Sequence, residues 1–145
     1  MFKHILIPTD GTDLSRKAVI YGMQLAKSVG ARVTAITISE PYHVASMDAV
    51  LVAETPEEHE AQTARVAERA LEQVRMAAEA ASVSAETVRE VHDQPYRAII
   101  DAAHARNCDL IVMASHGRRG MSALLLGSET VKVLTHSTIP VLVYR

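Results

Sequence analysis

The chain has 145 residues, of which 48% are hydrophobic and 3% aromatic, and its formal net charge at pH 7 is −2. This length can bury a hydrophobic core without disulfides, whereas the lack of a basic excess and the scarcity of aromatic residues argue against nucleic-acid binding. No hydrophobic run approaches the roughly 18 to 20 residues of a membrane span, and no signal peptide is evident, so we expect one domain with neither a nucleic-acid nor a membrane partner.

The N-terminal segment predicts a strand followed by a helix. The run Ile5-Leu6-Ile7 is short, hydrophobic and rich in β-branched residues, which is typical of a strand buried on both faces in a parallel sheet. Thr12 or Asp13 can cap the helix that follows, and Gly30 stands where a left-handed cap belongs.

The rest of the chain continues this alternation of strands and helices. The patterns predict strands at residues 3–8, 33–38, 87–91, 110–113 and 140–144, helices at 13–29, 56–82, 95–105 and 128–136, and a loop at 42–55. The strand at 87–91 alternates hydrophobic and polar residues, so we expect it at an edge of the sheet. The order predicts an α/β fold with an open parallel sheet and helices on both faces.

Two loops with unusual residues follow predicted strands. Pro8-Thr9-Asp10-Gly11 follows the first strand, and a second loop begins at Ala114 and ends at Gly127-Ser128, directly before a helix. In open α/β sheets ligands bind at the carboxyl ends of the strands, which places a candidate site between the first and fourth strands. Glycines and a helix start suit phosphate binding, although glycines in a loop serve tight turns equally well.

Other motifs give no catalytic or metal site. Neither GxxxxGK[ST] nor GxGxxG occurs. His59 has no second histidine four residues on, so zinc binding is unsupported. Ser115 and His116 are neighbours in the second loop, but the sequence identifies no third group for a triad, so we expect no catalytic residue.

Three segments resemble the universal stress protein family. They are KHILIPTDGTDLSRKA at the start, MASHGRRGMSALLLGSETVKVL around the second loop, and IPVLVYR at the end. Their order and spacing match the family over essentially the whole chain. The resemblance implies a single universal-stress-protein-like domain over residues 1–145. It also implies that this domain contains an open five-stranded parallel sheet with strand order 3-2-1-4-5.

Many members of this family bind ATP or AMP through a motif of Gly, two residues, Gly, nine residues, and Gly followed by Ser or Thr. Gly117, Gly127 and Ser128 match this motif, while Ala114 stands in place of its first glycine. The resemblance implies that the phosphates meet these residues and the Glu129 amide, and that adenosine meets Asp10. The remaining implied contacts are Pro8 and Thr9 beside Asp10, Ile38 through its backbone, and His116, Arg118 and Gly120 in the loop.

The resemblance implies a stress-response protein that binds ATP or AMP, with or without Mg²⁺, and acts as a dimeric sensor or regulator. Two alternatives remain open, namely a slow ATP-hydrolysing or nucleotidyl-transferring enzyme and a dimeric interaction module without nucleotide binding. The homodimer is expected through the last strand, from Ile139 to Tyr144, which is hydrophobic and lies at the sheet edge. The single cysteine, Cys108, is expected to fill apolar space and favours a cytoplasmic location.

Overall fold

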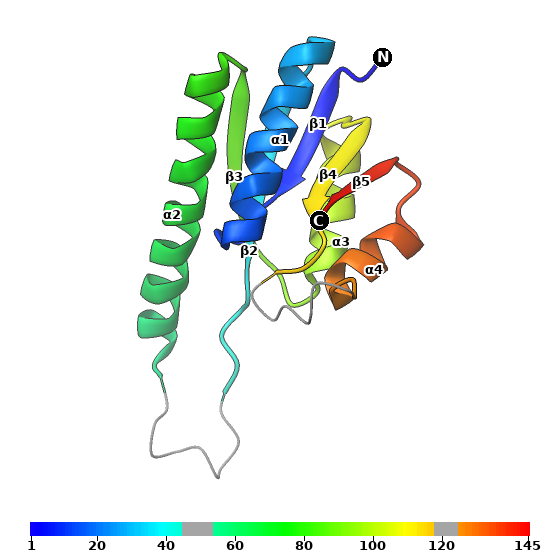
Figure 1. Ribbon diagram of the computed structural model, residues 1–145. Coiled ribbons are helices and arrows are strands. Elements are labelled where there is room, and N and C mark those ends of the chain that lie inside the picture. Colours follow the sequence, from blue (N-terminus) through cyan, green and yellow to red (C-terminus); the bar gives the residue numbers. More distant parts are fainter. Residues whose placement is uncertain (45–53, 118–124) are drawn as a thin grey trace.

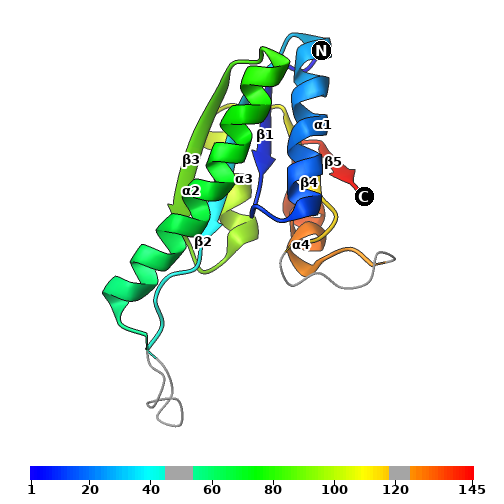
Figure 2. The same cartoon turned by 60° about the vertical axis from the view of Figure 1, so that its left-hand side comes forward.

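The computed structural model describes residues 1–44, 54–117 and 125–145 (Figure 1). Its elements are β1 (His4–Pro8), α1 (Asp13–Val29), β2 (Arg32–Ser39), α2 (Pro56–Ala81), β3 (Ala85–Val91), α3 (Pro95–Ala105), β4 (Leu110–Ala114), α4 (Ser128–His136) and β5 (Val141–Tyr144). The five strands are parallel in the order β3-β2-β1-β4-β5, which confirms the expected fold. Figure 2 shows α1 and α2 in front of the sheet and α3 and α4 behind it.

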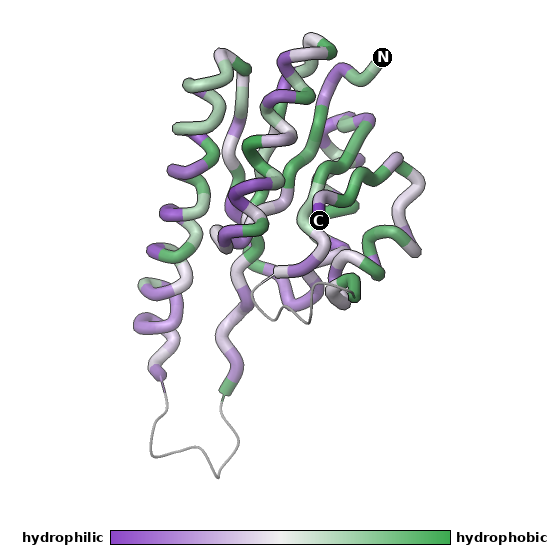
Figure 3. The backbone as a smooth tube through the Cα atoms, viewed as in Figure 1, coloured by the Kyte–Doolittle hydropathy of each residue, from purple (hydrophilic) through white to green (hydrophobic). Residues whose placement is uncertain are grey.

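The central strand β1 is covered on both faces. Ile5 and Ile7 pack with residues of α1 and α2, whereas Leu6 between them packs with residues of α3 and α4. A strand in this position needs an unbroken hydrophobic run, which Figure 3 shows along β1 and β4. Cys108 is buried in the same hydrophobic cluster as Leu6, as predicted, and burial raises the pKa of its thiol to about 11.

Most helix boundaries follow the signals read from the sequence. The Thr12 side chain caps α1, and Gly30 ends that helix with φ of 70°. The strand β3 begins two residues before the predicted start, because its ladder with β2 already pairs Ala85 with Val33. Of the predicted loop at 42–55, residues 42–44, 54 and 55 are described and belong to neither a helix nor a strand.

The long helix α2 is strongly charged on its outer side. Figure 3 shows a hydrophilic N-terminal half, and further along Arg75 forms ion pairs with Glu68 and Glu72. None of the helices within the described ranges is long and apolar enough to cross a membrane.

Candidate functional site

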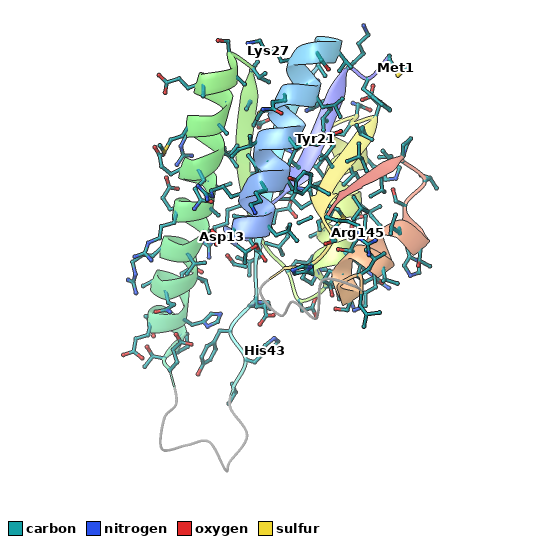
Figure 4. All side chains as sticks on the ribbon, viewed as in Figure 1. Met1, Asp13, Tyr21, Lys27, His43 and Arg145 are labelled. Carbon is teal, nitrogen blue, oxygen red and sulfur yellow. The ribbon has the colours of Figure 1, made fainter. Side chains whose placement is uncertain are left out.

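The candidate site lies where the strand order reverses. β1 pairs with β2 on one side and with β4 on the other, so the carboxyl ends of β1 and β4 are neighbours. The chain leaves β1 toward the face covered by α1 and leaves β4 toward the face covered by α4. Figure 4 shows Asp13, the first residue of α1, at this end of the molecule. The two loops singled out in the sequence therefore lie at the same end of the sheet.

The Asp10 carboxylate is held rigidly at the start of α1. Its Oδ1 accepts hydrogen bonds from the Thr12 amide at 3.0 Å, the Thr12 hydroxyl at 2.6 Å and the Ser15 hydroxyl at 2.7 Å. Thr9, just before it, is buried and donates its amide hydrogen to the Ile36 carbonyl at 2.9 Å. Sequence reasoning missed this anchoring role of Thr12 and Ser15, although an acidic residue two positions before a helix cap is a usable signal.

The loops after β1 and β4 touch at Gly117. A Cβ atom at position 117 would lie 2.5 Å from Oδ2 of Asp10. Because three hydrogen bonds fix the other carboxylate oxygen, Asp10 has little freedom to move away. Glycine at 117 thus allows the second loop to approach the first closely.

The start of α4 is docked on the end of β4. The Gly127 amide donates to the Ser115 carbonyl at 2.7 Å, and the buried Thr130 hydroxyl donates to the Ala114 carbonyl at 3.0 Å. A Cβ atom at position 127 would lie 3.0 Å from the Cα atom of His116, so a side chain there would push the His116 backbone away by a few tenths of an ångström. Thr130 was missed by sequence reasoning, and its signal is a small polar residue on the inward face of the helix.

The N-terminus of α4 lacks a side-chain cap from the described residues. Its cap position is Gly127, and the first hydrogen bond within the helix runs from the Val131 amide to the Gly127 carbonyl at 3.0 Å. In contrast, Thr12 caps α1 and Thr55 caps α2. The amides of residues 128–130, at the positive end of the helix dipole, therefore have no side-chain acceptor in the part of the chain that the structure describes.

The Glu129 side chain caps a different helix. Its carboxylate accepts a hydrogen bond from the Tyr96 amide at 2.9 Å, in the first turn of α3, and contacts the Lys132 ammonium at 3.2 Å. The cap residue of α3, Gln94, makes no such bond itself. The carboxylate is therefore engaged at α3, whereas the Glu129 amide belongs to the open turn of α4. The sequence carried no signal for this pairing between two helices.

The end of β4 departs from the family motif without backbone strain. Ala114 is the last residue of β4, is buried, and pairs with Tyr144 of β5. Within the described ranges, only Ser82 and Asn107 among the non-glycine residues have positive φ. Alanine therefore fits the place of the first motif glycine as an ordinary strand residue.

Ser115 and His116 contact each other, although they are neighbours in the chain. The Ser115 Oγ lies 3.2 Å from the His116 Nδ1, and Ser115 is 4% exposed. No carboxylate in the described part of the chain hydrogen-bonds to His116, so the pair has no third partner there. This arrangement could move a proton but lacks the group that orients the base in a triad.

The structure gathers most of the expected site residues at one end of the sheet. Ile38 lies near the end of β2, half-buried against the hydrophobic cluster that includes Leu6 and Ile36. The others at this end are Pro8, Thr9, Asp10, Ala114, His116, Gly117, Gly127, Ser128 and Glu129. Arg118 and Gly120 lie outside the described residues. In the ranges that are described, no three His, Cys, Asp or Glu side chains form a group that could hold a metal ion.

Comparison with known proteins finds one family that matches the chain. A model of the universal stress protein family matches residues 1–145. The universal stress protein MJ0531 of Methanocaldococcus jannaschii is 31% identical over 149 aligned residues, which cover 100% of this chain and 83% of that protein.

Two solved structures share the fold over nearly their whole length. The universal stress protein UspA from Lactobacillus plantarum has a TM-score of 0.81 and 25% identity, covering 99% of this chain and 98% of its own. A universal stress protein crystallised in complex with cAMP has a TM-score of 0.73 and 25% identity, covering 99% and 97% respectively.

Proposed function

The chain belongs to the universal stress protein family, and on that premise we propose that it binds an adenine nucleotide, ATP or AMP, as a cytoplasmic sensor or regulator in a stress response. The observation that carries this proposal is the N-terminus of α4, which has no side-chain cap from the described residues and packs on His116, next to the Asp10–Gly117 contact. The relative in complex with cAMP supports an adenine nucleotide as the ligand.

The residues present fit the parts of such a ligand. The amides of Ser128 and Glu129 offer donors to phosphate oxygens, and Gly117 and Gly127 let the two loops pack closely beside them. A carboxylate such as Asp10 suits a ribose hydroxyl and repels phosphate, so it orients the ligand with the sugar toward β1. The Ile38 backbone then meets the adenine edge, and any Mg²⁺ arrives with the phosphates.

The direct test is to identify and titrate the nucleotide. Mass spectrometry of the supernatant after denaturing the purified protein should reveal released ATP or AMP. Calorimetric titration should then show that Ser128→Ala weakens binding by about 1.5–3 kcal/mol, the value of a hydrogen bond to a charged group. Ser28→Ala, at the other end of α1, is the matched control and should bind like the parent. Absence of binding by the parent would favour an interaction module instead.

A slow enzymatic activity is the second candidate, because Ser115 and His116 are in contact. We rank this candidate below the sensor, because a general base accelerates a reaction by about 10²–10⁴-fold only when it is correctly oriented. ATP turnover near one per second that is lost in His116→Ala would establish the enzyme in place of the sensor.

A homodimer through β5 completes the proposal. Among the described residues β5 is an edge strand paired with β4, and its side chains reach both faces, since Leu142 packs against the cluster that includes α1 and Val141 against the cluster that includes α4. Tyr21 of α1 stacks near Tyr144 with ring centroids 5.5 Å apart, and Val131 and Leu134 of α4 are more than 40% exposed. A second copy pairing along this edge would cover both the strand and these side chains.

Sedimentation of two matched variants tests the dimer. Val141→Lys in β5 should shift the protein to monomer, because a charge would then lie in the paired edge. Val91→Lys places the same change on β3, at the opposite edge, and should leave the dimer intact. Equal behaviour of the two variants, or a parent that is monomeric at micromolar concentration, would contradict this interface.

A further inference from the structure

His59 joins the segment that follows β2 to the segment that begins α2. Its ring lies near the start of α2, where Nδ1 is 2.9 Å from the Glu54 carboxylate. Its Nε2 is 2.8 Å from the main-chain carbonyl of Glu40, just after β2. Tyr42 packs edge-on against the imidazole and donates its hydroxyl hydrogen to the Glu54 carbonyl at 2.9 Å. The end of β2 and the start of α2 are thus connected through one imidazole ring.

Both neighbours of the ring can only accept hydrogen bonds. A carbonyl oxygen and an ionised carboxylate have no hydrogen to donate, whereas a neutral imidazole has one N–H and one lone pair. Either neutral tautomer would therefore direct a lone pair at an oxygen less than 3 Å away. Only the imidazolium form, which carries a hydrogen on each nitrogen, satisfies both contacts.

The charges around His59 favour the same form. The acidic side chains near it are Glu54, Glu40 and, next in the helix, Glu60. The cation paired with Glu60 is Arg89 of β3, which contacts its carboxylate at 2.7 Å and also donates hydrogen bonds to the hydroxyls of Ser39 and Thr63. The Glu40 carbonyl, and after it the Glu54 carboxylate, raise the pKa of His59 above its ordinary value of 6.5.

We propose that His59 is a proton-dependent clasp that fastens the end of β2 to the start of α2 when the ring is doubly protonated and releases it when the ring loses a proton. The sign follows from linkage. Because the folded pKa is raised, the clasp stabilises this region fully below the unfolded pKa, and the stabilisation is lost as the pH rises through the folded pKa. The clasp shares no residue with the proposed nucleotide site, although Glu40 follows Ile38 closely in the chain, and its tests do not require a bound nucleotide.

NMR of the full-length protein tests the clasp directly. The His59 ring signal, assigned as the one absent from His59→Gln, should titrate above 6.5 and show both ring nitrogens protonated at pH 6. Glu54→Gln should lower that pKa, because it removes the carboxylate at Nδ1. The matched control is Glu57→Gln, since the Glu57 side chain makes no hydrogen bond or ion pair with the described residues, and it should leave the pKa unchanged.

A second measurement reports on the backbone. Hydrogen exchange of peptides covering residues 54–63, corrected for the intrinsic pH dependence, should slow below the His59 pKa in the parent and lose this dependence in His59→Gln. A His59 pKa at or below 6.5, or a single protonated ring nitrogen at pH 6, would overturn the proposal. Those two results need only the parent protein and His59→Gln, so they decide the matter even if Glu54→Gln fails to fold.

Discussion

The amino end of the sheet and the start of α4 at its carboxyl end differ in how their polar groups are partnered. At the amino end, the Asp109 carboxylate accepts hydrogen bonds from the amides of Lys3 and His4, at 2.8 and 3.1 Å. The His4 ring lies between the Arg106 carbonyl and the Thr34 hydroxyl, at 3.0 and 2.7 Å, so its neutral form satisfies both neighbours. At the carboxyl end, the first-turn amides of α4 have no side-chain cap from the described residues.

This difference separates stability from binding. Polar groups that satisfy each other inside the protein stabilise the fold, because leaving one without its partner costs the desolvation of that group. Donors that are open at a helix start serve an external acceptor instead. Substitutions of the paired groups at the amino end should therefore change mainly the free energy of unfolding, and those that disturb the amides at the start of α4 should change mainly nucleotide affinity.

The largest effect is expected for Gly127→Val. The new Cβ atom would press on the His116 backbone at 3.0 Å and displace the turn that presents the α4 amides. Loss of two hydrogen bonds to phosphate, at about 1.5–3 kcal/mol each, corresponds to roughly 100-fold weaker binding or more. Calorimetry with ATP measures this, and Ala61→Val on the exposed side of α2 is the control. Unchanged affinity in a folded Gly127→Val would remove the α4 turn from the site.

Asp109→Ala, at the amino end of the sheet, should lower stability and leave nucleotide affinity nearly unchanged. It removes the acceptor of two main-chain amides at the start of β1, so we expect a loss of about 2–3 kcal/mol in the free energy of unfolding. Nucleotide affinity should stay within about twofold of the parent, because the site is at the other end of the sheet. Urea denaturation followed by circular dichroism measures the first, with Asp101→Ala on the exposed side of α3 as the control. A large loss of nucleotide affinity with little loss of stability would contradict the assignment of a structural role to the amino end.

The fold was predictable from the sequence because each of its elements carries a local signal. Ile5-Leu6-Ile7 marks a buried strand, Pro95 marks the first position of α3, and Gly30 marks the end of α1. The start of β3 was placed two residues late, since its extent depends on pairing with β2 rather than on its own pattern. The strand order came from the family resemblance, not from the periodicity of hydrophobic residues.

The candidate site was predictable only as a set of positions. Glycines in the second loop and Asp10 in the first were visible, and the structure places Asp10 against Gly117. The bond from the Tyr96 amide to the Glu129 carboxylate was not, because it joins two helices whose relative placement no local pattern encodes. The same limit applies to His59, whose partners come from both sides of a connection in the chain.

A smaller effect at the carboxyl end is expected for Glu129→Ala. This change uncaps α3, as loss of a helix cap does, and should lower the free energy of unfolding by about 1 kcal/mol. It also removes a negative charge close to the open turn of α4, so phosphate binding should become slightly stronger, by less than about threefold. Glu129→Gln retains an acceptor for the Tyr96 amide and should recover much of the stability. A weaker affinity in both variants would show that the carboxylate itself holds the ligand.

The smallest effect is expected on the pH dependence of stability, and it contrasts His4 with His59. Burial, and after it the charge of Arg32, lower the pKa of His4, so its folded form resists protonation. As the pH falls below about 6.5, the unfolded chain takes up a proton at His4 that the folded chain refuses. The contribution of His4 to stability is therefore complete above that pH and declines as the pH falls toward the lowered pKa. The His59 clasp behaves in the opposite way.

Urea denaturation of the parent and His4→Gln between pH 7.5 and 5 measures this contribution. Glutamine can donate to the Arg106 carbonyl but does not titrate, so the stability difference between the two proteins should shrink as the pH falls. Repeating the pair in a His59→Gln background removes the opposing trend, since His59 stabilises more as the pH falls. A difference that stays constant would mean that His4 titrates alike in the folded and unfolded chains. A difference that grows would mean that the Asp109 and Glu86 charges outweigh burial at the amino end.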